Sequence, residues 1–174
     1  MPAVVTKRET TRSGVRKIRP TDLDALSAMT GLTAEEVDAA LGNLQQRLVK
    51  SQRSLVQLEP LGGGATMTVR ASSLRPAARS YSSLQGVEVP GYRVRPMPAL
   101  DLHTQVDRAV KGALSALTST FGEQEDARTW MQTGNAAFAG KTPASVLGDG
   151  QVNAITTVLG AARRGVALLS LIHI

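Results

Sequence analysis

The chain has 174 residues and is 42% hydrophobic but only 3% aromatic, so its cores must be built mainly from Ala, Val and Leu. It contains no cysteine, which excludes disulfides, thiolate nucleophiles and Cys-based zinc sites. No stretch approaches the roughly 20 apolar residues that cross a bilayer, so we expect a soluble, cytoplasmic protein.

The net charge of +6 is concentrated in the first half of the sequence, and charges balance beyond Leu100. The basic residues are Lys7, Arg8, Arg12, Arg16, Lys17 and Arg19 near the N-terminus and Arg53, Arg70, Arg75, Arg79, Arg93 and Arg95 in the middle. This asymmetry indicates a polyanionic partner, most commonly nucleic acid. Residues 1–19 predict a flexible basic arm, and its candidate nucleic-acid contacts are Arg12, Arg16, Lys17 and Arg19. Solvated arginines with no partner are the alternative.

A first helix is predicted after a boundary at Pro20. Thr21 is a suitable N-cap, and Asp24 adds negative charge to the first turn. Gly31 interrupts the helix. Its apolar stripe has members three positions apart: Leu23, Leu26 and Met29.

A second helix is predicted to begin with a capping box, in which Thr33 is the N-cap and Glu36 lies three residues later. Its buried face consists of Val37, Ala40 and Leu41. The periodicity continues beyond Gly42 as another helix through Leu44, Leu48 and Leu55. We therefore expect a helical domain over residues 20–57.

The segment ALSAMTGLTAEEVDAAL resembles a helix-turn-helix, with Gly31 in the turn. Its second helix carries Glu35, Glu36 and Asp38 and has no Arg, Lys, Asn or Gln before Gly42. Phosphates repel carboxylates, and the usual bidentate base readers are missing. Direct base readout by this helix is therefore disfavoured relative to a helical hairpin that packs or dimerises.

Residues 58–99 are a connector rich in Gly, Pro and Arg. Short alternating stretches surround Val69 and Val87, and a Pro90-Gly91 turn precedes Tyr92. They are equally typical of a two-stranded β-ribbon and of an irregular connector. The glycine triplet at residues 62–64 is not followed by Lys-Ser or Lys-Thr, which excludes a phosphate-binding loop of the nucleotide-binding type.

From Leu100 the helical period returns, so the fold class is mainly α with a small C-terminal helical bundle over residues 100–168. Helices are predicted up to Gly122, over 123–131, over 143–147 and over 151–164. Thr142 as N-cap and Pro143 at the first position start the third of them. The inner faces are Leu102, Val106, Val110, Leu114 and Leu117 in the first helix and Val152, Ile155, Val158, Leu159 and Ala162 in the last.

The stretch EDARTWMQTGNAAFAGKTPASVLGDGQVNAITTVLGAARRG, within residues 121–165, resembles the C-terminal toxin-binding domain of bacterial Xre/MbcA/ParS-type antitoxins. The pattern is a Trp-hydrophobic pair, a loop, a Thr-Pro step, a Leu and a Gly-led last helix. It is carried by Trp130, Met131, Phe138, Gly140, Thr142, Pro143, Leu147, Gly150, Val152, Leu159 and Gly165. Large aromatic side chains in an Ala-rich and Val-rich segment are expected to anchor its core rather than to contact a partner.

The resemblance implies an antitoxin that binds a RES-type toxin, an enzyme that destroys NAD, and closes its active site without catalysing anything. The candidate toxin-binding residues are on the exposed side of the last helix and just beyond it: Gln151, Thr157, Arg163, Arg164 and Gly165. The resemblance also implies that the N-terminal half helps the chain to form a homodimer or to bind the promoter of its own operon. That half is longer here than in the short family members.

No enzymatic site is expected. The two histidines, His103 and His173, have no nucleophile or metal partner at convincing spacing, so no catalytic residue, cofactor or metal is predicted. The alternative function is a non-enzymatic, DNA-binding transcription regulator without a toxin partner. Tyr81 and Tyr92 are too sparse to form a stacking platform for single strands, which leaves phosphate contacts.

The last six residues, LSLIHI, resemble the in-frame translation of a sequencing adapter. We therefore expect the authentic sequence to be interrupted near Leu168, with residues 169–174 an artefact and the authentic C-terminus missing, and we exclude His173 from the candidate ligands.

Overall fold

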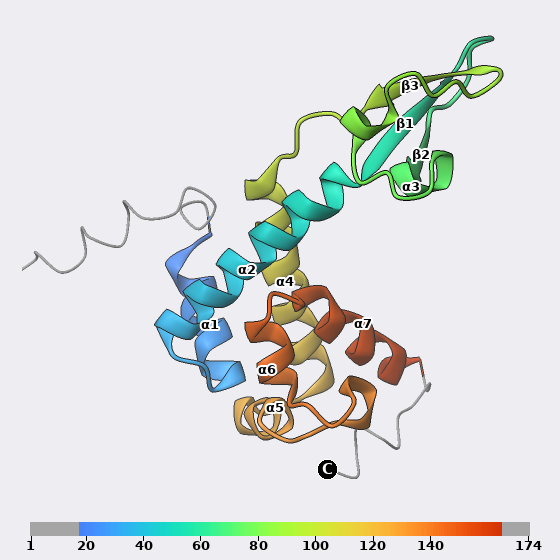
Figure 1. Cartoon of the computed structure of the whole chain (residues 1–174). Helices are drawn as coiled ribbons and strands as arrows, with labels where there is room; N and C mark the ends of the chain where they lie inside the picture. Colours follow the sequence, from blue (N-terminus) through green and yellow to red (C-terminus); the bar gives the residue numbers. More distant parts are fainter. Residues whose placement is uncertain (1–17, 165–174) are drawn as a thin grey trace, which may run out of the picture. The chain divides into compact units, whose positions relative to one another are not determined.

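The computed structural model describes residues 18–164 and is mainly helical, with a small antiparallel sheet in the middle of the chain (Figure 1). Contacts divide the chain into two compact units. The helical unit combines the residues up to Gln45 with those from Asp101 onward, and the β-sheet unit is Gln46–Leu100. The predicted fold class is confirmed. Most of the predicted arm, and the LSLIHI tail, lie outside the described residues.

Helix α1 (Pro20–Thr30) begins two residues earlier than the sequence suggested. Arg19, not Thr21, is the N-cap, because Pro20 at the first helical position has no N–H to satisfy and its φ already suits a helix. Asp22 rather than Asp24 then stands in the first turn, and its carboxylate lies 3.2 Å from the Arg19 guanidinium. The helix ends at Gly31, whose φ of 77° is left-handed.

Helix α2 (Ala34–Arg53) begins with the predicted capping box. The backbone N–H of Glu36 donates to the Thr33 hydroxyl at 3.1 Å, and the Thr33 N–H donates back to the Glu36 carboxylate at 3.5 Å. The predicted interruption at Gly42 is wrong, because α2 continues unbroken for 20 residues. A single glycine costs a helix about 1 kcal/mol, and the burial of Leu41 and Leu44 on either side offsets that cost.

Four further helices complete the helical unit: α4 (Leu102–Thr120), α5 (Gln124–Met131), α6 (Pro143–Gly148) and α7 (Val152–Arg163). Helix α4 packs on α7 and on α1, and Figure 1 shows α4 behind the other helices of this unit. The buried stripe of α4 is rich in alanine, and Gly112 lies next to Thr156 of α7. Small side chains let these helices approach closely. The approach has to be close, because the chain has few aromatic side chains that could fill a wider gap. No helix within residues 18–164 has the length and apolar composition needed to cross a membrane.

Two hydrogen bonds join the C-terminal end of α1 to side chains of α5 and of Gln132, the residue that follows α5. The Arg128 guanidinium donates to the Ala28 carbonyl at 3.0 Å, and the Gln132 amide donates to the Thr30 carbonyl at 2.7 Å. These are carbonyls at the C-terminal end of α1 that have no partner within their own helix. The first helices and the C-terminal bundle thus share one unit. The sequence suggested a separate domain over 20–57, because a helical pattern does not say which helix it packs against.

The loop between α6 and α7 contacts α2 directly. The Asn43 side chain donates to the Gly148 carbonyl at 2.8 Å. Gly150 has a φ of +87°, and a Cβ there would lie 2.6 Å from backbone atoms of Asn43 and Leu44. Only glycine fits both the conformation and the space.

The β-sheet unit holds three antiparallel strands in the order β2-β1-β3: β1 (Leu55–Pro60), β2 (Met67–Arg70) and β3 (Tyr92–Pro96). Short helices α3 (Ala71–Leu74) and η1 (Tyr81–Leu84) follow β2. The extension of the helical period to Leu55 is wrong, because α2 ends at Arg53 and Leu55 is the first residue of the central strand. The stretch around Val69 forms β2, but the stretch around Val87 is not a strand, and Val89 only makes an isolated bridge to Tyr92. The strand that follows the Pro90-Gly91 turn is β3, and β2 and β3 each pair with β1 and not with each other.

We expect Gly150→Ala to lower the free energy of unfolding by about 2–4 kcal/mol. Alanine is strained in the left-handed backbone conformation and also overlaps the α2 backbone. The measurement is urea denaturation of the full chain followed by circular dichroism. Gly148→Ala is the matched control, since its added Cβ meets nothing within 4 Å and its φ is not positive. Equal stability of the two variants would contradict the close packing described at Gly150.

Candidate functional site

An aromatic cluster anchors the C-terminal part of the helical unit. Trp130 of α5 is 3% exposed. Its ring centroid lies 5.7 Å from that of Phe121 and 6.4 Å from that of Phe138, the latter in an edge-on arrangement. Such pairs stabilise a core beyond the area they bury. The signature Trp therefore faces inward, and Phe138 is half-buried beside it.

Hydrogen bonds within the loop between α5 and α6 stabilise its conformation. It contains the short helix η2 (Ala136–Phe138). Asn135 is 2% exposed, and its side chain accepts from the Ala137 N–H at 2.8 Å. The Gly140 N–H donates to the Asn135 carbonyl at 2.9 Å, and a Cβ on Gly134 would lie 2.7 Å from the Gly140 carbonyl oxygen. Sequence reasoning singled out Gly140 but missed Asn135 and Gly134, for which the Gly-Asn pair before η2 was the available signal.

Helix α6 starts at the Thr-Pro step. The Thr142 hydroxyl accepts from the Ser145 N–H at 3.1 Å, and Pro143 occupies the first position, as the sequence predicted. Pro143 and Leu147 are buried. These two signature residues position the loop at Gly150 and hence the start of α7.

Helix α7 has a buried side and an exposed side. The buried side consists of Val152, Ile155, Leu159 and Ala162, whereas Val158, predicted on this face, is only half-buried. On the other side Thr157 is exposed, and its hydroxyl donates to the Asn153 carbonyl at 2.9 Å. The Arg164 guanidinium lies beside Gly160, 3.5 Å from where a Cβ would stand.

The candidate toxin-binding residues that the structure describes are all exposed: Gln151, Thr157, Arg163 and Arg164. Gly165 lies outside the described residues, as do the proposed nucleic-acid contacts Arg12, Arg16 and Lys17. The remaining member of that set is Arg19, which is exposed and paired with Asp22. The structure places Thr157 and Arg164 two turns apart on one side of α7, with Gln151 and Arg163 at its two ends on other sides, so it does not bring all four together.

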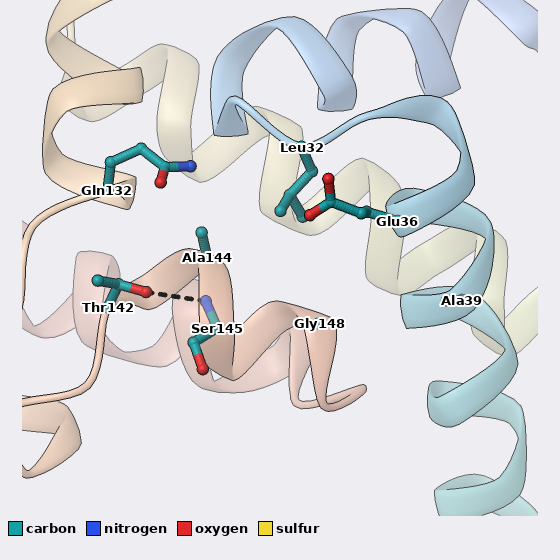
Figure 2. Close-up of a pocket in the computed structure, with 8 residues that line it drawn as sticks. All are labelled: Leu32, Glu36, Ala39, Gln132, Thr142, Ala144, Ser145 and Gly148. Carbon is teal, nitrogen blue, oxygen red and sulfur yellow. Dashed lines mark hydrogen bonds between the residues drawn. The ribbon is translucent and has the colours of Figure 1, made fainter.

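An open cleft of about 370 Å³ lies between the start of α2 and α6 (Figure 2). Figure 2 shows Leu32, Glu36 and Ala39 on one wall, facing α6 across the cleft. The other lining residues are Gln132, Thr142, Ala144, Ser145 and Gly148. A single carboxylate among hydroxyl, amide and methyl groups offers no acid-base pair and no nucleophile with a base.

No other chemistry gathers in the described part of the chain. Residues 18–164 contain no group of three or more His, Asp or Glu side chains that could hold a metal ion. His103 stands alone in the first turn of α4, where it is half-buried.

Comparison with known families matches residues 116–165 to the antitoxin Xre/MbcA/ParS C-terminal toxin-binding domain. The matched segment begins near the end of α4 and includes α5, η2, α6 and α7. Comparisons with curated proteins and with solved structures found no match for the chain. The resemblance seen in the sequence is confirmed by this match over residues 116–165.

Proposed function

We propose that the protein is the antitoxin of a type II toxin-antitoxin system and that it binds a RES-type, NAD-degrading toxin and occludes its active site. The observation that carries the proposal is the match of residues 116–165 to a toxin-binding domain. The fold of that segment supports it, because the large signature side chains Trp130, Met131 and Leu147 are buried in its core. Inhibition is then stoichiometric, and the antitoxin itself catalyses nothing.

The exposed side of α7 is the proposed contact surface. Thr157 and Arg164 are seven positions apart, which is two helical turns, so they lie on the same side of the helix. Arg163 adds a second positive charge at the C-terminal end of α7. Gln151 lies at the opposite end, and Gly165 is the next residue of the sequence after Arg164. Exposed arginines are frequent anchors of protein interfaces.

We also propose that the chain forms a homodimer in the cytoplasm and that it represses the promoter of its own operon. The second candidate function is a DNA-binding regulator without a toxin partner. It is favoured by one observation, the excess of basic over acidic residues in the first half of the chain.

The test is co-expression of the chain with the adjacent open reading frame. Rescue of cells from a toxic neighbour, together with recovery of a complex of the two proteins, is the expected result. A neighbour that is not toxic and is not recovered with the chain would leave the DNA-binding regulator as the better description.

In such a complex, we expect the double variant Arg163→Glu/Arg164→Glu to bind the toxin at least about tenfold more weakly, because reversing charges at a contact surface creates repulsion. Titration calorimetry measures the affinity. The control is Arg108→Glu/Lys111→Glu, which makes the same charge change on α4, outside the matched segment. All four residues are exposed, but Lys111 is ion-paired with Asp107 at 2.8 Å. Each variant should therefore unfold within about 1 kcal/mol of the parent, which denaturation measures alongside the affinity. An undiminished affinity in the α7 variant would remove this surface from the proposal.

A further inference from the structure

Charge is distributed unevenly between the two units. The β-sheet unit has eight basic and two acidic residues, for a net charge of +6 in 55 residues. The basic ones are Arg47, Lys50, Arg53, Arg70, Arg75, Arg79, Arg93 and Arg95, against Glu59 and Glu88. In the described part of the helical unit the balance is reversed, with seven basic and eleven acidic residues. Within the described chain, the sheet unit is therefore the part that attracts a polyanion.

The strand register places three of these arginines on one face of the sheet. Side chains of directly paired residues point to the same side. Leu55 pairs with Arg70, Gln57 with Arg95, and Glu59 with Arg93. Positions 55, 57 and 59 alternate with the buried Val56 and Leu58, so their partners share the side turned away from the core.

The opposite face of the sheet is covered by the unit's own core. Val56 packs there with Ala71, Ala78 and Leu84, and with half-buried valines of both edge strands. Arg79 follows directly after Ala78, so it belongs to the covering segment and not to the arginine face. We call the uncovered side the basic face, and its members are Arg70, Arg93 and Arg95 with Leu55, Gln57, Thr68 and Glu59.

The dimensions of the basic face suit a phosphate backbone. Arg93 and Arg95 are two residues apart on β3, about 7 Å. Arg70 lies two strands away and is offset along the sheet, which puts it about 12 Å from Arg95 and about 17 Å from Arg93. Duplex DNA carries one charge per roughly 1.7 Å of its axis, so several phosphates fall within reach of this area. All three arginines are exposed.

The face favours a duplex over a single strand. Single-strand binding needs aromatic side chains on which bases stack. The aromatic residue of β3, Tyr92, pairs with Pro60 and so stands on the core side of the register. The basic face offers guanidinium, amide and hydroxyl groups, the side chains that β-ribbon proteins use in DNA grooves and on phosphates.

The helix pair α1 and α2 is a poorer surface for DNA. Gln132 and Arg128 of α5 cover the turn at Gly31. Glu36 and Ala39 of α2 face α6 across the cleft, which leaves Glu35 among the outward side chains of the first turn. Carboxylates at the entrance to a groove are repelled by phosphates.

We propose that the basic face of the β-sheet unit binds the phosphate backbone of double-stranded DNA. Glu59 attenuates this binding, because it is the single carboxylate on the face and it is ion-paired with Arg95. The inference concerns the sheet unit and does not depend on toxin binding.

The first test measures loss of binding. Fluorescence anisotropy follows the full chain binding to a labelled mixed-sequence duplex between about 50 and 200 mM salt. We expect Arg70→Gln/Arg93→Gln/Arg95→Gln to weaken binding at least about 30-fold and to lower the salt slope by about 2–3, since each phosphate contact contributes about 0.9. The triple control Arg79→Gln/Arg108→Gln/Lys111→Gln should stay within about threefold of the parent. An equal loss in both triple variants, or none in the first, would overturn the proposal.

The second test measures a gain of binding, which a misfolded variant cannot mimic. Glu59→Gln removes the carboxylate and frees Arg95, so we expect roughly 3–10-fold tighter binding to the same duplex. Glu88→Gln makes the same charge change outside the paired strands and should alter affinity less than about twofold. Equal gains in the two variants would mean that only net charge matters, and the proposed face would be refuted. Tighter binding of a single-stranded RNA of equal length than of the duplex would refute the choice of partner.

Discussion

The helical unit depends on a contact between two backbones, that of Gly150 with α2 at Asn43 and Leu44. An alanine-rich core has little side-chain volume with which to span a gap, so its helices and loops must come close together. The hydrogen bonds from α5 to the end of α1 have the same origin, since they satisfy carbonyls that a close neighbour would otherwise leave buried and unpaired. The toxin-binding segment and the first helices therefore stabilise each other.

Local signals in the sequence predicted local structure well. The capping box at Thr33 and the Thr-Pro start of α6 depend on neighbours within four positions, and both form as expected. The inner face of α7 also forms, except that Val158 is only half-buried. The first helix shows the limit of such signals. Thr21 and Pro20 both favour a helix start, and the fixed φ of proline prevailed over the hydroxyl.

Long-range structure was predicted less well. Leu55 continues the helical spacing of Leu44 and Leu48, and only its pairing with Arg70 across the sheet makes it a strand residue. The docking of the α6–α7 loop on α2 joins positions more than 100 residues apart, and no local pattern encodes it. In the candidate site, the family pattern in the sequence correctly identified the segment that the family model matches. Helical periodicity alone predicts which side chains of α7 are exposed. The roles of Asn135 and Gly134 could not be predicted, because they depend on contacts within the folded loop.

The order of the two units along the chain has a consequence for synthesis. The sheet unit lies between the two sequence segments of the helical unit. Helix α1 is therefore synthesised about 100 residues before α5, the helix to which it is hydrogen-bonded. At roughly 5–20 residues per second, that delay is on the order of 5–20 s. The pairing of β1 with β3 shortens the interruption, because it brings Val56 beside Pro96 before α4 is complete. A ribosome that stops before α5 is made therefore leaves α1 without the helix that binds its C-terminal carbonyls.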